Sequence, residues 1–405
     1  MLGALERTFG HLSESGQWRV LEGYTERRMT GARSQRISAA VLGATGAVGQ
    51  RMVSLLADHP WFELGELVAS ERSAGRAYGE AVSWRLPCPL PDAAARLVVR
   101  ALPPTLHSRP KSTTGGLAST PPHTDDPLRS RVLFSALDAD LAGPVEEVLA
   151  AAGHAVVSNA KSHRLDPDVP LVIPEVNGGH MALIGAQRRR LGTEGFIVTN
   201  PNCSATGLTM ALAAIEESVG VDTAVVATLQ AVSGAGYPGL PSLDILDNVV
   251  PFIAGEEEKL EREPLKMLGR LSASSERINE AGFTIAAMVH RVPVVDGHLV
   301  SALVRMRREA SLDSIRRAWV EWSRSRALGL PSAPAEPLIV LDAIDRPQTR
   351  LDRDAAGGMA TTIGRVRSAP GGGIRFTCVA HNTLRGAAGA AVLNAELLVR
   401  EGYLP

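Results

Sequence analysis

One of the three cysteines lies where a thiol could act as a nucleophile. Cys203 is in the segment NPNCS, between a short apolar stretch that ends at Thr199 and a long apolar segment with helical spacing. A thiol at the start of a helix faces unpaired amides and the positive end of the helix dipole, and both favour the thiolate. Cys88 lies in proline-rich sequence and Cys378 in an apolar strand pattern, so both fit the usual role of a small buried hydrophobe better. Cys203 is therefore the predicted nucleophile.

A thiolate nucleophile needs one group that moves protons and another that holds the substrate. Both kinds of residue occur in the segment HRVPVVDGH at 290–298, which has a histidine at each end. The Asp-Gly pair within apolar sequence is equally typical of a plain hairpin with polar ends. From the residues alone, a catalytic segment and a hairpin both stay open.

The loop GATGAVG at 43–49 follows an apolar strand pattern at 37–42 and opens a segment with helical spacing. Glycine permits the tight turn and the close backbone approach that a pyrophosphate at a helix N-terminus requires. The spacing is GxxGxxG and not GxGxxG, so the motif by itself also fits a structural turn. Its place between a strand and a helix favours dinucleotide binding.

The segment after the second strand pattern, 64–69, indicates which dinucleotide binds. It reads SERSAG at 70–75, with hydroxyls and a guanidinium where a ribose-binding acid usually leads. These groups suit a 2′-phosphate better than a 2′-hydroxyl, although Glu71 counts against that interpretation. We therefore expect NADP rather than NAD, with an ordinary polar loop as the alternative.

The elements that must position these residues form two parts. Between 37 and 199, apolar strand patterns alternate with helical segments. This alternation predicts an α/β fold, a Rossmann-type doubly wound parallel sheet with helices on both faces. Longer β-branched patterns follow, with helices expected at 256–268 and 312–324. They predict an α+β domain with a mainly antiparallel sheet, followed by a helical tail at 384–400.

Composition and charge limit the remaining possibilities. The net charge of −1 gives no reason to expect nucleic acid or an anionic membrane as a partner, and no stretch approaches the length of a membrane span. Three scattered cysteines predict neither a disulfide framework nor a metal site, so we expect a reduced, cytoplasmic protein. Residues 1–36 are weakly patterned, and eight of the 26 prolines fall within 88–130. We predict a poorly ordered extension and a largely disordered insertion there.

Seven segments, in the same order along the chain, resemble the aspartate-β-semialdehyde dehydrogenase family, in particular its archaeal and fungal subgroup. They are GATGAVGQR (43–51), DHPWFELGELVASERSAGRAYGEAVSW (58–84), SHRLDPDVPLVIPEVN (162–177), TNPNCSATGL (199–208), LQAVSGAGYPG (229–239), HRVPVVDGH (290–298) and NTLRGAAGAAVLNAE (382–396). The resemblance covers roughly 37–87 and 131–405. The extension and the insertion match nothing expected of that family.

The resemblance implies roles for individual residues. Cys203 would be the nucleophile, His298 the general acid and base, and Gln230 the residue that orients the substrate. Arg291 would bind the substrate α-carboxylate, because a planar guanidinium makes two parallel hydrogen bonds to a carboxylate.

The remaining contacts implied by the resemblance fall into two sets. The phosphate and substrate-amine contacts would be Arg164, Glu263 and Lys266, with Asn202 beside them, although Pro264 stands where the family usually has threonine. The cofactor contacts would be Gly43, Thr45, Gly46, Ala47, Val48, Gly49, Ser70, Arg72, Ser73, Ser135 and Asn382.

The implied reaction is the NADPH-dependent reductive dephosphorylation of L-aspartyl 4-phosphate to L-aspartate 4-semialdehyde through a cysteine thioester. It belongs to the biosynthesis of lysine, threonine, methionine and isoleucine. The implied assembly is a homodimer or a homotetramer. The NADP-binding domain would comprise 37–202 and 380–405, and the catalytic and dimerisation domain 203–379.

Other functions remain as alternatives at this stage. N-acetyl-γ-glutamyl-phosphate reductase uses the same thioester chemistry, but its histidine motif differs from HRVPVVDGH. A malonyl-CoA reductase resembles this subgroup more closely and would take a CoA thioester. A non-catalytic NADP-binding protein would not need the set Cys203, Gln230, Arg291 and His298.

Overall fold

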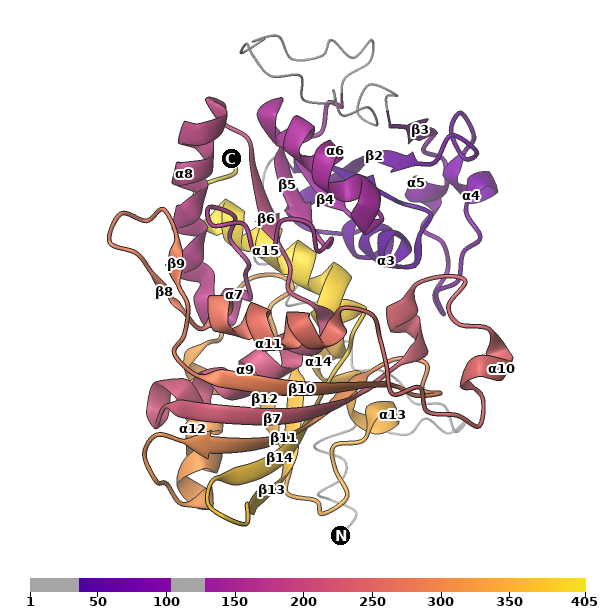
Figure 1. Ribbon diagram of the computed structural model, residues 1–405. Helices are drawn as coiled ribbons and strands as arrows, with labels where there is room; N and C mark the ends of the chain where they lie inside the picture. The colour runs from indigo at the N-terminus through magenta and orange to yellow at the C-terminus, as the bar shows by residue number, and fades with distance from the viewer. Residues whose placement is uncertain (1–35, 103–127) are drawn as a thin grey trace, which may run out of the picture.

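The computed structural model describes residues 36–102 and 128–405, which fold into a Rossmann half and a second half (Figure 1). The first half contains a six-stranded sheet in the order β3-β2-β1-β4-β5-β6, and every pairing in it is parallel. Its strands are β1 (Ile37–Leu42), β2 (Phe62–Ala69), β3 (Val99–Ala101), β4 (Val132–Ser135), β5 (Ala155–Ser158) and β6 (Phe196–Thr199). The predicted doubly wound parallel sheet is confirmed.

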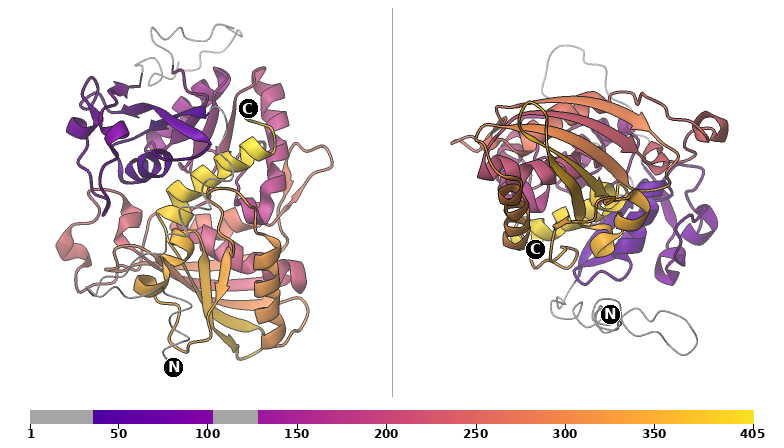
Figure 2. Two further views of the ribbon diagram at one scale, coloured as in Figure 1. Left: turned by 180° about the vertical axis from the view of Figure 1, so that it is seen from behind. Right: turned by 90° about the horizontal axis from the view of Figure 1, so that it is seen from below.

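Helices cover both faces of this sheet, and the alternation of side chains along β1 shows how. Ala39 and Val41 pack in one cluster with α3 (Ala47–Leu56) and α15 (Gly389–Arg400), whereas Ala40 and Leu42 pack with α6 (Ala139–Ala151) on the opposite face. Figure 2 shows α15 crossing the back of the molecule between the two halves. No helix in the described ranges combines the length and the apolar character that a membrane crossing would need.

The strand order reverses at β1, which lies between β2 and β4. In open sheets of this kind, the crevice beyond the carboxyl ends of the strands at the reversal point is where ligands bind. The glycine loop at 43–49 leaves β1 at this point and leads into α3. The sheet topology therefore places the predicted nucleotide loop where a cofactor is expected.

The second half contains a mixed six-stranded sheet in the order β10-β7-β11-β14-β13-β12. Its strands are β7 (Val221–Gln230), β10 (Thr284–Arg291), β11 (His298–Met306), β12 (Leu338–Val340), β13 (Thr361–Ser368) and β14 (Ile374–Ala380). The three inner pairings are antiparallel, as predicted, while the two outer pairings are parallel. A separate hairpin pairs β8 (Arg270–Leu271) with β9 (Ile278–Asn279).

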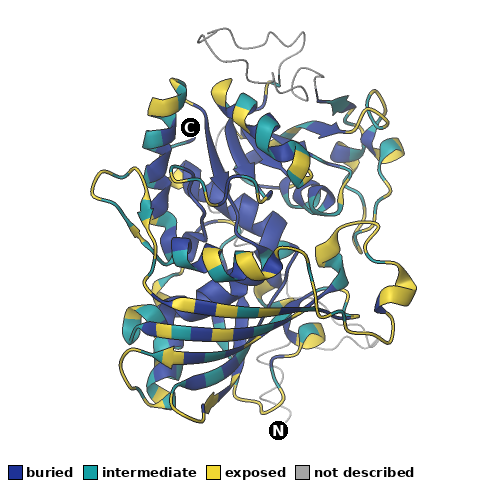
Figure 3. Ribbon diagram, viewed as in Figure 1, coloured by how far each residue is buried: buried dark blue, intermediate teal, exposed yellow. Residues whose placement is uncertain are grey.

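One face of this second sheet packs against helices and the other is open (Figure 3). The helices α9 (Cys203–Ser218), α11 (Glu256–Met267) and α12 (Leu312–Ser325) share a hydrophobic cluster with the inward side chains of the sheet. Along β7, β10 and β11, buried residues alternate with exposed or half-buried ones. Figure 3 shows this alternation as stripes on the uncovered face.

Short helices and three irregular turns complete the described fold. They are α4 (Tyr78–Ala81), α5 (Asp92–Ala95), α7 (Pro174–Asn177), α8 (Ile184–Leu191), α10 (Ser242–Ile245), α13 (Thr349–Asp352), α14 (Ala355–Gly358), the 3₁₀ turns η3 (Gly178–Leu183) and η4 (Val232–Ala235), and the π-helical turn η5 (Leu384–Ala388). The predicted helical tail is therefore η5 followed by α15.

The predicted insertion at 88–130 needs correction. Residues 88–102 are ordered and include α5 and β3, which pairs with β2 at the edge of the Rossmann sheet. The prolines there lie in the connections and not in β3, so a proline-rich composition did not prevent strand formation. Residues 103–127 of the insertion, and 1–35 of the extension, lie outside the described residues.

Candidate active site

Cys203 lies at the junction of the two halves. The strand β6 ends at Thr199, and α9 begins at Cys203, with Asn202 as its N-cap. The Asn202 side-chain oxygen accepts hydrogen bonds from the amides of Ser204 and Ala205, which fixes the first turn of the helix. The predicted switch from strand to helix is confirmed, and it presents the thiol at the carboxyl edge of the Rossmann sheet.

Three more predicted residues meet at one edge of the second sheet. Gln230 and Arg291 are the last residues of the parallel strands β7 and β10 and lie directly opposite each other. His298 is the first residue of β11, which runs antiparallel to β7 and so begins at the same edge. The Sγ atom of Cys203 is 3.2 Å from Nε2 of His298. Residues from three strands therefore gather at one sheet edge, and His298 contacts the sulfur.

The protonation of this pair differs from the sequence prediction. Burial, and then the nearby Glu256 carboxylate, raise the pKa of the Cys203 thiol to about 12, against the effect of Arg164, Arg291 and Lys259. Burial, with the positive charge of Arg291, lowers the pKa of His298 to about 3. A thiolate was predicted from the helix dipole, whereas burial and Glu256 favour the neutral thiol, and burial and Arg291 favour the neutral imidazole.

Arg291 is buried but keeps donors free for a ligand. One guanidinium nitrogen, Nη1, donates to the carbonyl oxygen of Ala231 at 2.8 Å, and this is its only hydrogen bond among the described residues. Gly234 leaves the space in front of this group open. A Cβ atom at Gly234 would lie 2.8 Å from Nη1 of Arg291 and 3.1 Å from Nε2 of His298.

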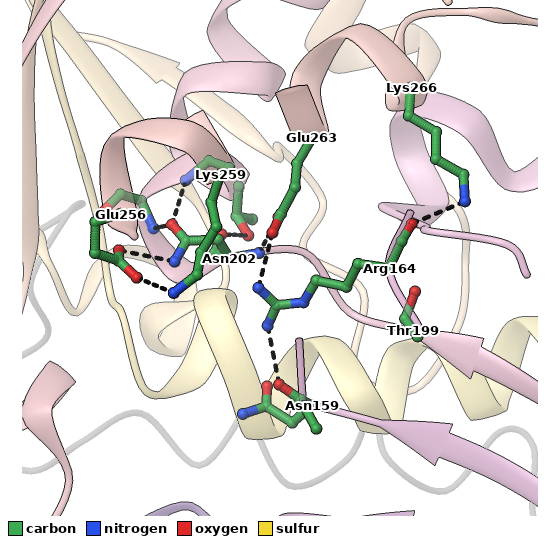
Figure 4. A network of polar contacts seen from close by, with 12 residues as sticks. Asn159, Arg164, Thr199, Asn202, Glu256, Lys259, Glu263 and Lys266 are labelled. Atoms are coloured by element: carbon green, nitrogen blue, oxygen red, sulfur yellow. Dashed lines mark hydrogen bonds and ion pairs between the residues drawn. The ribbon is translucent and has the colours of Figure 1, made fainter. Parts of the chain in front are cut away.

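Two functional candidates on α11 escaped the sequence analysis. Glu256 begins this helix, accepts a hydrogen bond from Nδ2 of Asn202 at 2.8 Å and forms an ion pair with Lys259 (Figure 4). Gln230 also donates to Glu256, at 3.4 Å. The sequence did contain a signal for them. The spacing Glu-x-x-Lys occurs twice in α11, at 256–259 and 263–266, and two pairs seven residues apart lie on the same side of a helix.

The second Glu-x-x-Lys pair is used differently from the prediction. Nζ of Lys266 donates to the backbone carbonyls of Arg164, Asp166 and Val169, at 2.7–2.8 Å. These three bonds use all three donors of the ammonium group, and the side chain is buried. Lys266 therefore ties the loop at 164–169 to α11, and it has no donor left for a substrate.

Arg164 and Glu263 form a buried ion pair that holds this loop beside Cys203. Nη1 of Arg164 is 2.9 Å from Glu263, and Nη2 donates to the carbonyl of Asn159 (Figure 4). The other Glu263 oxygen accepts the backbone amide of Asn202. Nε of Arg164 is buried without a partner among the described residues, so its N–H can still donate to a ligand. Pro264, the departure from the family pattern, lies within α11 without interrupting it.

A cavity of about 480 Å³ opens beyond the carboxyl ends of β1, β2, β3 and β4. The predicted cofactor residues Gly43, Thr45, Gly46, Ser70 and Arg72 line it. Leu102, which the sequence analysis assigned to the disordered insertion, lines it as well, together with Asp138 and apolar residues of α6 and the loop before it. No short sequence motif marks these additional walls, because they come from elements that are distant in the sequence.

The glycines of the loop are required by close backbone contacts. Gly43 has a φ of +77°, and a Cβ atom there would lie 2.4 Å from the carbonyl oxygen of Ala136. A Cβ atom at Gly49 would lie 2.1 Å from the carbonyl oxygen of Gly43. The loop thus stays close to both β4 and α3, and the cavity next to it fits an extended phosphate-containing cofactor.

The other predicted cofactor residues do not line this cavity. Ser135 is buried, and its hydroxyl donates to Glu146 at 2.5 Å. The Asn382 side chain instead accepts a hydrogen bond from the amide of Gly297, the residue before His298, and donates one to the hydroxyl of Ser233. Ala47, Val48, Gly49 and Ser73 also lie outside the cavity lining.

Comparisons of sequence and structure agree with one another. Residues 38–184 match the semialdehyde dehydrogenase NAD binding domain, and residues 212–385 match the semialdehyde dehydrogenase dimerisation domain. An aspartate-semialdehyde dehydrogenase of Archaeoglobus fulgidus is 45% identical over 90% of this chain and 99% of its own length. One of Cryptococcus neoformans is 44% identical over 91% of this chain and 98% of its own. The crystal structure of the Candida albicans enzyme with NADP aligns with a TM-score of 0.79 at 38% identity, over 91% of this chain and all of that chain.

A glycine-loop domain and a dimerisation domain, with a cysteine at the junction between them, are the architecture of a two-domain semialdehyde dehydrogenase. The archaeal and fungal relatives narrow this class further, because they match along nearly their whole length. The chain belongs to the aspartate-semialdehyde dehydrogenase family. The resemblance seen in the sequence is confirmed.

Proposed function

We propose that this protein reduces L-aspartyl 4-phosphate to L-aspartate 4-semialdehyde with NADPH, releasing inorganic phosphate, as a step in amino-acid biosynthesis. The observation that carries the proposal is the 3.2 Å approach of the Cys203 sulfur to His298, at the edge where Arg291 ends its strand. A sulfur beside a polar proton-bearing group and a carboxylate-binding cation is suited to forming a thioester with an acyl substrate.

The charges around the sulfur fit a substrate with an α-carboxylate, an ammonium group and an acyl phosphate. Arg291 supplies a planar cation for the carboxylate. Glu256 is the buried carboxylate that suits the ammonium group. Burial alone would raise the pKa of Glu256, but Lys259 and Asn202 outweigh that effect and keep the pKa below its usual value. Lys259 and Arg164 are the cations available for the phosphate. Gln230, between Glu256 and the sheet edge, would orient the substrate.

NADP fits the cavity beside the glycine loop, and when bound it supplies the hydride. The loop amides after Gly43 would hold the pyrophosphate, and Ser70 and Arg72 would hold the 2′-phosphate. The Candida albicans relative was solved with NADP, which supports this choice. Ser135 would contribute through its backbone only, because its hydroxyl is engaged by Glu146.

The proposed reaction is tested most directly in reverse. Purified protein should reduce NADP when it receives aspartate semialdehyde and inorganic phosphate together, and omission of phosphate should stop the reaction. Malonyl-CoA with NADPH is the matched alternative substrate. Activity only with the CoA thioester would overturn the assignment to aspartyl phosphate.

Gly49→Ala should weaken NADP binding by about tenfold or more, because the new Cβ atom would collide with the backbone of Gly43 and displace the loop. Titration calorimetry with NADP measures the effect. Gly185→Ala is the matched control, since this glycine is also helical and its Cβ atom would have room. Equal NADP affinity of both variants would contradict the proposed role of the loop.

The open face of the second sheet is the surface we propose for a homodimer. Val225, Leu229 and Met288 are exposed there, with 38–48% of their surface accessible, and they lie on neighbouring strands. Such an apolar patch on adjacent strands suits burial against another copy. The match of this half to a dimerisation domain supports the proposal. A tetramer would need a further interface.

Met288→Glu should shift the protein from dimer to monomer, because it would bury a charge in the apolar contact. Sedimentation velocity at several protein concentrations measures the change. Leu351→Glu is the control, since Leu351 is also exposed but lies on α13. If Met288→Glu sediments like the parent protein, the dimer does not use this face.

We place the enzyme in the cytoplasm. All three cysteines are free thiols, and the proposed nucleophile must stay reduced to react.

A further inference from the structure

An ion pair joins the helix that follows the glycine loop to the turn that precedes His298. Nη2 of Arg51, in α3, is 3.5 Å from Oδ2 of Asp296, which lies two residues before that histidine. The two side chains are only 18% and 15% exposed. Among the described residues, Arg51 is the only cation that forms an ion pair with this carboxylate, and the other oxygen of Asp296, Oδ1, is buried without a hydrogen-bond partner. The guanidinium of Arg51 is therefore the charge partner of Asp296.

The Arg51 end of this pair is closely connected to the glycine loop. A Cβ atom at Gly49, two residues before Arg51, would lie 2.1 Å from the carbonyl oxygen of Gly43, so the loop and the start of α3 are in backbone contact. Gln50, which precedes Arg51, is buried and donates to the carbonyl oxygen of Thr45 at 3.0 Å. Since the loop and the helix are packed this closely, a displacement of the loop displaces Arg51.

The carboxylate end of the pair is connected to the substrate side of the site. Gly297, which follows the carboxylate, donates its amide hydrogen to Asn382 at 2.8 Å, and Asn382 donates to the hydroxyl of Ser233 at 2.8 Å. Gly234, the next residue of η4, would carry a Cβ atom 3.1 Å from Nε2 of His298. The turn before His298 and the wall in front of it therefore form one hydrogen-bonded unit.

We infer that Arg51 is a positioning residue of the proposed reaction: through Asp296, it holds the turn that leads into His298 at a fixed place relative to the glycine loop. The inference rests on the proposed function, in which the glycine loop binds NADP and the sulfur beside His298 holds the acyl group. Hydride transfer requires these two to meet in a fixed geometry, and a displacement of about 1 Å can cost about a hundredfold in rate. Arg51 does not line the cofactor cavity, so its effect is on geometry and not on binding.

A second ion pair between the two halves provides a matched comparison. Nη2 of Arg189, in α8, is 3.7 Å from Glu276, in the hairpin of β8 and β9. Their side chains are 64% and 61% exposed, and exposed pairs of this kind contribute little to stability. Neither residue belongs to α3 or to the turn before His298. Removal of this pair therefore breaks a contact between the halves without affecting the connection through Arg51.

Steady-state kinetics separates geometry from binding. Arg51→Gln removes the charge and should lower kcat for NADP reduction about tenfold, with the KM for NADP and for aspartate semialdehyde within twofold of the parent. Arg51→Lys keeps the charge and should retain at least about a third of the parental kcat. Arg189→Gln should keep the parental kcat. A raised KM for NADP with an unchanged kcat would show that Arg51 serves cofactor binding and would overturn the inference.

The carboxylate is tested in the same assay. Asp296→Asn keeps the shape of the side chain and should lower kcat as much as Arg51→Gln does. If the two residues act as a pair, the double variant should lose no more than about twofold beyond either single variant, whereas independent residues would lose about a hundredfold together. A multiplied loss would refute the pairing.

Hydrogen exchange tests the same connection without catalysis. Exchange at the amides of 292–299 is followed by mass spectrometry on the full chain, with and without NADP. Because the loop, α3 and the turn are joined, addition of NADP should slow this exchange at least about threefold in the parent and in Arg189→Gln. In Arg51→Gln the slowing should be lost at 292–299 but retained at 43–50. Equal slowing at 292–299 in Arg51→Gln and in the parent would contradict the inference.

The exchange measurement has an outcome separate from that of the activity assay. If the protein does not reduce NADP with aspartate semialdehyde and phosphate, but exchange at 292–299 follows the expected pattern, then the proposed substrate is wrong and the role of Arg51 stands. If the protein is active and NADP leaves exchange at 292–299 unchanged in the parent, then the role of Arg51 is wrong and the proposed function stands.

Discussion

Cys203→Ala should reduce NADP reduction with aspartate semialdehyde and phosphate by about a thousandfold or more, since removal of a covalent nucleophile removes the whole thioester route. Alanine retains the Cβ atom that packs against Gly386, where the two backbones are in close contact. The start of α9 is held by Asn202 and does not depend on the sulfur. Steady-state kinetics measures the loss of turnover, and titration calorimetry with NADP tests whether cofactor binding is retained.

The control for this variant is Cys88→Ser, which changes an exposed cysteine outside the site. It should keep the parental rate. NADP affinity should remain within about twofold of the parent in both variants, because the cavity beside the glycine loop is not lined by Cys203. Substantial turnover by Cys203→Ala would show that the reaction does not pass through a thioester on this residue.

Arg291→Lys should raise the KM for aspartate semialdehyde by about thirtyfold, the equivalent of about 2 kcal/mol for a charged hydrogen-bonding pair. Lysine keeps the positive charge, but its ammonium group cannot make the two parallel hydrogen bonds that a planar guanidinium makes to a carboxylate. It would also lose the hydrogen bond to the Ala231 carbonyl. The KM for NADP should not change, because Arg291 is not part of the cofactor cavity.

Arg305→Lys is the matched control, because this arginine is exposed on β11 of the same sheet and far along the strand from His298. It should leave both KM values unchanged. If the KM of Arg291→Lys for aspartate semialdehyde stays within twofold of the parent, another cation binds the α-carboxylate.

Elements with a strong local signal were predictable from the sequence. The glycine loop and the strand-to-helix switch at Cys203 both appear in the structure, whereas the segment 290–298 was ambiguous from its residues and His298 was assigned only through the family resemblance. In each, the signal lies within a few residues: glycines between a strand and a helix, or a polar residue at the end of an apolar run. Features of this kind can be predicted because consecutive residues of one short segment form them, without contributions from distant parts of the chain.

Features that depend on distant partners were not predictable. The two Glu-x-x-Lys pairs of α11 are alike in sequence, and only the packing shows that Glu256 bonds to Asn202, next to Cys203, while Lys266 bonds to backbone carbonyls. Similarly, β3 is a strand because it pairs with β2, in spite of the prolines around it. The pKa of Cys203 depends on burial, which the position at a helix start does not reveal.

The helix α9 begins at the end of a Rossmann strand, but its side chains are buried in the core of the other half. The sulfur is therefore held by the half whose sheet carries His298 and Arg291, whereas the glycine loop belongs to the Rossmann half. A change of coenzyme preference can be acquired in the 70–73 segment without moving the reacting sulfur relative to its imidazole. The preference for a coenzyme and the preference for an acyl substrate can thus evolve independently, because the residues for each lie in different halves, which residues 200–202 connect.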